Sequence, residues 1–217
     1  MKNKYITCVF LILFLIVVGC SRMQWAHFYL LDYVPPITKS DILEEPFPYT
    51  IQVKDFKIDK TYDNSRIVIR QSAHEVYYDR WSLWARRPQD AMSALIINHI
   101  RALNLVTECK KTFLDQRPDY IITGTIHNIE KYVSDLPLNE FQRADIRMTI
   151  QMLREKTNNT VVSYEVKRYA PLYTESMSFF AKTLSDTLKN EITIFLRKVQ
   201  EYFEQLQANQ PVTVPGK

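Results

Sequence analysis

The chain has 217 residues, and 28 Lys and Arg against 24 Asp and Glu give a formal charge of +4 at pH 7. This weak charge argues against nucleic acid binding, and the 46% apolar content with 12% aromatic residues argues against a disordered chain. Of the three glycines, only Gly124 lies away from the chain ends, which excludes the glycine-rich phosphate loops of nucleotide-binding proteins.

Residues 1–19 have the pattern of a secretory signal peptide. Lys2 and Lys4 form a basic start, an apolar run follows over residues 5–18, and Gly19 is the small residue at the cleavage position. The apolar run is shorter than the roughly 20 residues that a membrane-spanning helix needs. An uncleaved N-terminal anchor is the alternative, and the length and flanks of the run both disfavour it.

Residues 17–20 (VVGC) resemble the bacterial lipobox, in which the signal is cut before a cysteine that becomes acylated. The resemblance implies cleavage between Gly19 and Cys20 and a covalent lipid of three acyl chains on Cys20. Stable membrane anchoring takes two lipid signals, so such a lipid would hold the domain firmly. Ser21 stands where an Asp would favour the inner membrane, so by resemblance to lipoprotein sorting we expect the outer membrane.

The exported chain divides into three parts. Residues 20–48 form a lipidated N-terminus with an entry strand over residues 21–36 and a linker, residues 49–206 form a single α+β domain, and residues 207–217 form a disordered polar tail. Within the domain, residues 49–56 alternate between apolar and polar, as a half-buried strand does.

Residues 66–71 and 74–79 predict two short paired strands, and residues 80–88 predict a basic connection that carries two tryptophans. Pro88 suits the first position of a helix that we expect to reach about residue 104. A strand over residues 105–113 should follow it.

Residues 120–132 predict a strand with Gly124 at its middle, where the missing side chain should let a helix approach the sheet. Residues 141–153 alternate strictly, and a turn at residues 156–159 returns the chain as an antiparallel partner strand.

Two methionines of this hairpin, Met148 and Met152, face inward; we expect a sheet core there, with the lining of a lipid groove as the alternative.

The last predicted element is a long helix over residues 177–206 with an apolar stripe. At 1.5 Å per residue it would reach about 45 Å, so it either bends round the sheet or projects from it. The order of elements predicts an α+β fold: a two-layer sandwich of an antiparallel-rich mixed sheet with two main helices on one face.

The sequence indicates neither a metal site nor catalysis. The four histidines are scattered outside metal-binding spacings, and His99 lies on an apolar helical stripe, as a core histidine does. Cys109 is left alone once the signal and Cys20 are set aside. We expect it to be a small buried residue, with an intermolecular disulfide as the alternative.

Aromatic side chains mixed with arginines have the composition of a protein-interface hot spot. The candidate partner-binding residues are Tyr77, Tyr78, Trp81 and Trp84. The alternative is that some of them fill the core at the base of the first helix.

Several segments in chain order resemble the ABC-type transport auxiliary lipoproteins, the PqiC-like family. The matching residues are 29–31 (YLL), 66–70 (RIVIR), 75–78 (EVYY), 80–81 (RW), Pro88 before the amphipathic helix, and 119–126 (DYIITGTI). The resemblance covers most of residues 29–129, and the closing helix fits as well.

The resemblance implies a non-enzymatic outer-membrane lipoprotein on the periplasmic face of a Gram-negative envelope. Such proteins accompany an inner-membrane ABC transporter and a periplasmic lipid-carrying subunit of the MCE type, tether that system, and need no cofactor beyond their covalent lipid. The resemblance also suggests self-association into a homo-oligomer. The alternatives are a lipoprotein that assists another envelope machine, such as lipopolysaccharide export, and a periplasmic hydrolase.

Overall fold

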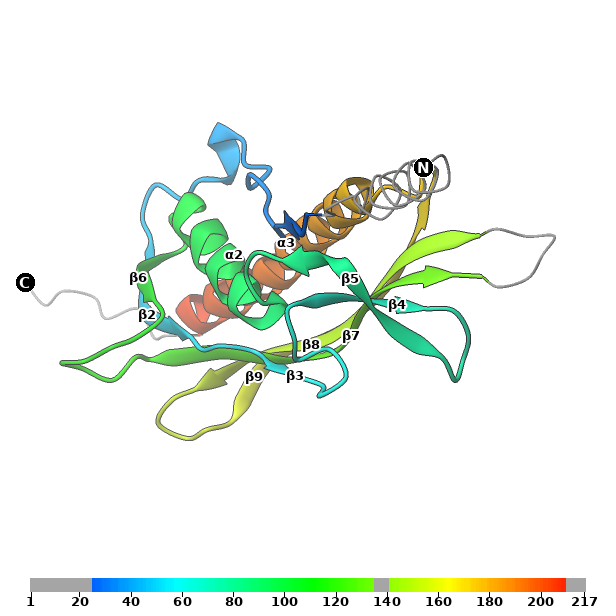
Figure 1. The fold of residues 1–217 in the computed structure, drawn as a ribbon. Helices are drawn as coiled ribbons and strands as arrows, with labels where there is room; N and C mark the ends of the chain where they lie inside the picture. The colour runs from blue at the N-terminus through cyan, green and yellow to red at the C-terminus, as the bar shows by residue number, and fades with distance from the viewer. Residues whose placement is uncertain (1–24, 135–140, 210–217) are drawn as a thin grey trace, which may run out of the picture.

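The computed structural model describes residues 25–134 and 141–209, so the predicted signal peptide, Gly19 and Cys20 lie outside the described residues. A mixed sheet of nine strands forms one layer, and helices α2 (Pro88–Ala102) and α3 (Met177–Ala208) form the other (Figure 1). Both helices cover the same face of the sheet. The predicted α+β fold is therefore confirmed.

The sheet is built round its longest strand, β7. The strands are β1 (His27–Tyr29), β2 (Phe47–Val53), β3 (Lys57–Ile58), β4 (Arg66–Arg70), β5 (Val76–Trp84), β6 (Val106–Lys110), β7 (Tyr120–Val133), β8 (Gln142–Arg154) and β9 (Thr160–Leu172), and a short 3-10 helix, η1 (Lys39–Asp41), precedes β2. β2, β3 and β4 pair in parallel with successive stretches of β7, whereas β8 pairs antiparallel with it and β9 antiparallel with β8. β6 extends the sheet beyond β2, and β5 and β1 extend it beyond β4.

The long helix α3 lies along the long strands of the sheet. The helix is about 48 Å long at 1.5 Å per residue, and its buried residues, from Phe180 to Phe203, span about three quarters of that length. β7, β8 and β9 have 14, 13 and 13 residues, which at about 3.3 Å per residue gives a similar length. The helix therefore buries its apolar stripe against the strands. Met148 and Met152 lie beneath it and are fully buried in the core, as expected.

Some predicted boundaries were wrong. The first strand stops at Tyr29, and the strand after α2 covers only Val106–Lys110. β5 continues to Trp84 through residues predicted as a connection, because the edge strand β1 supplies it with pairing partners. α3 includes residues 207 and 208 of the predicted tail, and the tail from residue 210 lies outside the described residues.

The missing side chain at Gly124 leaves space for the ring of Phe56, not for a helix. A Cβ atom at this position would collide with the side chain of Phe56, from the segment between β2 and β3, and with the backbone carbonyl of Thr149 on β8. Phe56 is itself buried. The expectation of a close helix is thus wrong, because a side chain from the neighbouring edge of the sheet fills the space first.

Cys109 is buried and free, as expected for a small core residue. Burial raises the pKa of its thiol to about 12. A buried thiol that stays protonated is unreactive, which counts against the alternative of an intermolecular disulfide.

His99 is a core residue, and its ring Nδ1 lies 3.1 Å from the hydroxyl oxygen of Tyr33. Burial lowers its pKa from 6.5 to about 4. The unfolded chain then binds a proton that the folded chain excludes, so stability should fall as pH drops from 6.5 towards 4. We expect a loss of about 2 kcal/mol between pH 7 and pH 5 from this residue.

Urea unfolding of wild type and His99→Gln at both pH values checks this prediction. The variant should lose less stability on acidification, and the exposed His74→Gln control should behave as wild type. Equal pH dependence in wild type and His99→Gln would contradict the assignment.

Candidate docking surface at one end of the sheet

Four chain segments meet at one end of the sheet. Arg70 pairs with Tyr132, Tyr132 with Arg143, and Arg143 with Pro171. The β4–β5 turn, the end of β7, the start of β8, the end of β9 and the start of α3 therefore share this end, at the right of Figure 1. The described chain begins beside the other part of β5, since β1 runs parallel to β5 with His27 beside Ser82.

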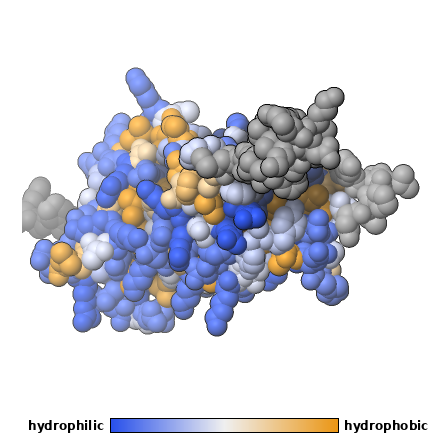
Figure 2. Space-filling model, in the orientation of Figure 1, coloured by the Kyte–Doolittle hydropathy of each residue, from blue (hydrophilic) through white to orange (hydrophobic). Residues whose placement is uncertain are grey.

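Exposed aromatic side chains gather at this end. They are Tyr77, Tyr78, Trp81, Phe141, Tyr169 and Tyr173, which we call the aromatic end. Figure 2 shows that the face seen in Figure 1 is largely hydrophilic with small hydrophobic patches. Tyrosine and tryptophan combine an apolar ring with a polar group, as residues at a contact surface do.

A break in strand pairing includes Trp81, whereas Tyr77 and Tyr78 pair regularly with Ile69 and Val68. Tyr78 pairs with Val68 but Leu83 pairs with Arg66, so the intervening β5 residues form a bulge. Within this bulge, the Asp79 carboxylate accepts hydrogen bonds from the backbone N–H groups of Trp81 (2.8 Å) and Ser82 (2.7 Å).

The exposed β5 side chains keep few internal contacts. The hydroxyl of Tyr78 donates to the carbonyl of Thr61 at 3.1 Å. The guanidinium carbon of Arg80 lies 5.1 Å from the centre of the Trp81 ring, within cation–π range. Burial and the charge of Asp79 raise the pKa of Tyr77. Tyr77, Tyr78 and Trp81 are thus exposed, and their role in partner binding stays a prediction.

Trp84 does not belong to this surface. It is 4% exposed, against 36% for Trp81, and its ring centre lies 6.1 Å from that of Phe180 on α3. Its prediction as a partner-binding residue is corrected: it fills the core beneath α3, the alternative weighed for it. Three residues along β5 move the side chain from the irregular, solvent-facing stretch to the covered face.

Arg143 lies among three aromatic rings, a cluster that the sequence did not predict. Its guanidinium carbon lies 4.3 Å from the ring centre of Tyr132, 4.8 Å from that of Tyr169 and 6.0 Å from that of Phe141. Its Nε donates to Asp145 at 2.8 Å. The rings come from β7, β9 and the start of β8, so only the strand register brings them together.

A buried charge cluster lies next to this group. Glu130 and Asp145 are directly opposite on β7 and β8 and are both buried. The Arg70 Nε donates to Glu130 at 2.7 Å, as does the Tyr62 hydroxyl at 2.7 Å. Burial raises the pKa of Asp145, and the charge of Glu130 adds to that effect. Each carboxylate has a guanidinium partner: Arg70 joins β4 to Glu130 on β7, and Arg143 pairs with Asp145 within β8.

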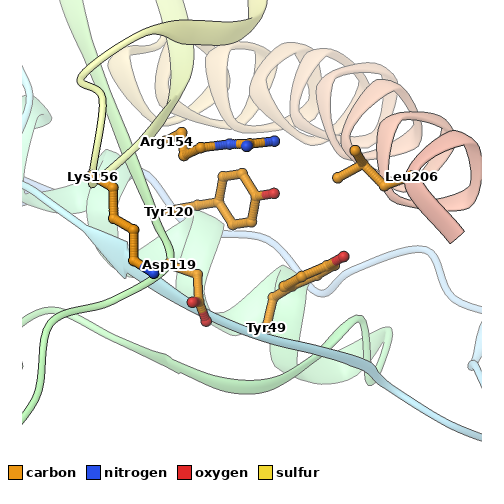
Figure 3. Close-up of a pocket in the computed structure, with 6 residues that line it drawn as sticks. All are labelled: Tyr49, Asp119, Tyr120, Arg154, Lys156 and Leu206. Carbon is orange, nitrogen blue, oxygen red and sulfur yellow. The ribbon is translucent and has the colours of Figure 1, made fainter. Parts of the chain in front are cut away.

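The opposite end of the sheet carries a cavity of about 300 Å³ (Figure 3). It is lined by Tyr49, Asp119, Tyr120, Arg154, Lys156 and Leu206. Arg154 donates to the Tyr202 hydroxyl at 3.0 Å, and Asp119 accepts from the backbone N–H and hydroxyl of Thr50. Burial and a hydrogen bond with Tyr202 raise the pKa of Tyr120.

The histidines and the free cysteine that the sequence offers for catalysis or metal binding do not lie together in one site. His99 and Cys109 are separate core residues, and His127 on β7 contacts the hydroxyl of Thr149 at 3.0 Å. Among residues 25–134 and 141–209, no three metal-ligating side chains come together. Within the same ranges, no helix is long and apolar enough to cross a membrane.

The fold is that of a class of bacterial proteins with known structures. A Xanthomonas campestris protein matches with a TM-score of 0.71 and 14% identity over 85% of this chain and 100% of that chain. The crystal structure of an uncharacterized protein matches with a TM-score of 0.61 and 10% identity over 81% and 99%. No curated protein sequence matches this one.

The sequence model of the ABC-type transport auxiliary lipoprotein component family matches residues 29–192. The chain belongs to this family, which confirms the resemblance seen in its sequence. The match runs from the end of β1 into the middle of α3, so it covers strands β2 to β9, helix α2 and the first half of α3.

Proposed function

We propose that the protein is an outer-membrane lipoprotein that serves as a non-catalytic docking and tethering subunit of an ABC-type intermembrane lipid transport system. The family match carries the proposal, because it names an auxiliary lipoprotein of ABC-type transport. The lipobox-like residues 17–20 add the means of attachment. The proposed partners are a periplasmic MCE-type subunit and its ABC transporter.

The proposed mechanism is positional. The lipid on Cys20 would hold the domain at the periplasmic face of the outer membrane, and the folded body would bind the periplasmic component. The long helix packed on three long strands gives that body a stiff axis. A stiff body transmits the position of the anchor to the partner, whereas a flexible one would let the partner diffuse.

Cys20→Ser tests the anchor. Because acylation needs the thiol, we expect the variant to lose the lipid mass from its N-terminal peptide and to disappear from the outer-membrane fraction. Mass spectrometry and membrane fractionation measure both effects, with Cys109→Ser as the matched control that keeps the anchor. An unmodified Cys20 in the native protein, or a retained leader, would contradict the proposal.

Crosslinking of the native protein in membranes tests the partner. Recovery of a permease, an ATPase and an MCE-type subunit is the expected result. Recovery of lipopolysaccharide-export components instead would favour the alternative role in another envelope machine. Recovery of no transporter component would count against docking.

A further inference from the structure

We infer that the β5 side of the aromatic end is a bilayer-contact surface, in which Tyr77, Tyr78 and Trp81 lie in the lipid headgroup region of the membrane that holds Cys20. The inference rests on the proposed acylation of Cys20. It goes further in stating which part of the folded body meets the membrane and by which side chains.

The first argument is the length of the tether. Five residues lead from Cys20 to Trp25, and an extended chain spans at most about 3.6 Å per residue. Trp25 therefore lies within about 18 Å of the acylated position. The body has little freedom to stand away from the bilayer.

The second argument is the direction of the chain where it enters the sheet. His27, Phe28 and Tyr29 pair in parallel with Ser82, Leu83 and Trp84. Read upstream, β1 therefore points from His27 in the same direction as β5 does from Ser82, past Trp81 towards Tyr78 and Tyr77. These three side chains are on the stretch of β5 that extends in the direction from which the described chain enters the sheet.

The third argument is side-chain chemistry. Tryptophan and tyrosine are enriched at membrane–water interfaces, where the ring enters the headgroup layer and the polar group stays wet. Arg80 stacks on Trp81 and forms no ion pair with any described residue, so its charge is free for a lipid phosphate. The one acidic side chain of the bulge, Asp79, is turned onto backbone N–H groups instead of outward.

Tryptophan fluorescence in vesicles tests the inference on the acylated mature protein. The vesicles contain phosphatidylethanolamine and phosphatidylglycerol, with or without brominated acyl chains that quench nearby tryptophans. Trp25→Phe retains Trp81 and Trp84, whereas Trp25→Phe with Trp81→Phe retains only the buried Trp84. Both variants keep the core tryptophan, so their difference reports Trp81 alone.

We expect brominated lipid to quench at least half of the Trp81 signal and to leave that of Trp84 nearly unchanged. The matched control adds Leu114→Trp to the double variant. Leu114 is exposed in the loop between β6 and β7, at the end of the sheet where β7 begins and opposite the aromatic end, so a tryptophan there should remain unquenched.

Equal, weak quenching of Trp81 and Trp84 on vesicle-bound protein would overturn the inference while leaving the anchor intact. That result would return Tyr77, Tyr78 and Trp81 to the role of a protein-binding surface. If mass spectrometry finds no lipid on Cys20, the proposed function fails, and the bilayer contact fails with it.

Discussion

Replacing Phe203 with alanine should lower the free energy of unfolding by about 3–5 kcal/mol. The ring is fully buried near the end of α3, and its centre lies 4.9 Å from that of Tyr49, 5.2 Å from Tyr120 and 5.3 Å from Phe47. These partners come from β2 and β7, so the ring joins the helix to two parallel strands. Its removal leaves a cavity that rigid neighbours cannot fill.

Urea unfolding followed by circular dichroism measures this loss. Phe203→Leu should recover part of the stability because it refills part of the space, and Glu201→Ala, exposed half a turn away, should stay within about 0.5 kcal/mol of wild type. A loss below about 1 kcal/mol for Phe203→Ala would show that the end of α3 frays, and the packing of this end would have to be revised.

Replacing Glu130 with methionine should lower the free energy of unfolding by about 3 kcal/mol. Glu130 is buried and accepts hydrogen bonds from both Arg70 and Tyr62. Its loss therefore leaves a guanidinium and a hydroxyl without their acceptor. Breaking a buried pair from one side costs about 3–5 kcal/mol. We expect a loss at the lower end of this range because the Arg70 side chain is 26% exposed and water can reach it.

A double-mutant cycle separates the pair from its surroundings. Glu130→Met with Arg70→Met should be more stable than Glu130→Met alone, because no unpaired charge remains. Asp186→Ala is the matched surface control: its ion pairs with Lys182 and Lys189 are exposed, so it should lose no more than about 0.5 kcal/mol. A Glu130→Met loss equal to that of the control would mean that the cluster is hydrated.

These two variants act at opposite ends of β7, and that division has a functional use. Glu130→Met loosens the sheet beside the aromatic end, whereas Phe203→Ala loosens it beside the Tyr49–Arg154 cavity. If the aromatic end meets the membrane, Glu130→Met should disturb vesicle contact more than Phe203→Ala does.

The sequence by itself determined the elements whose faces alternate with a fixed period. The stripe of α3 and the alternation of residues 141–153 predicted helix and strand because burial on one face imposes a period of 3.6 or 2 residues. Pro88 marked the start of α2 correctly. The family was also readable from the sequence, since it rests on short segments in a fixed order.

Only the tertiary structure decided which side chains are exposed where the period breaks. Trp81 and Trp84 read alike in the sequence, yet a bulge against β4 and pairing with β1 expose one and bury the other. The rings round Arg143 and the Phe56 ring over Gly124 come from separate strands or segments. Such contacts depend on the register between distant segments, and no local pattern of residues encodes that register.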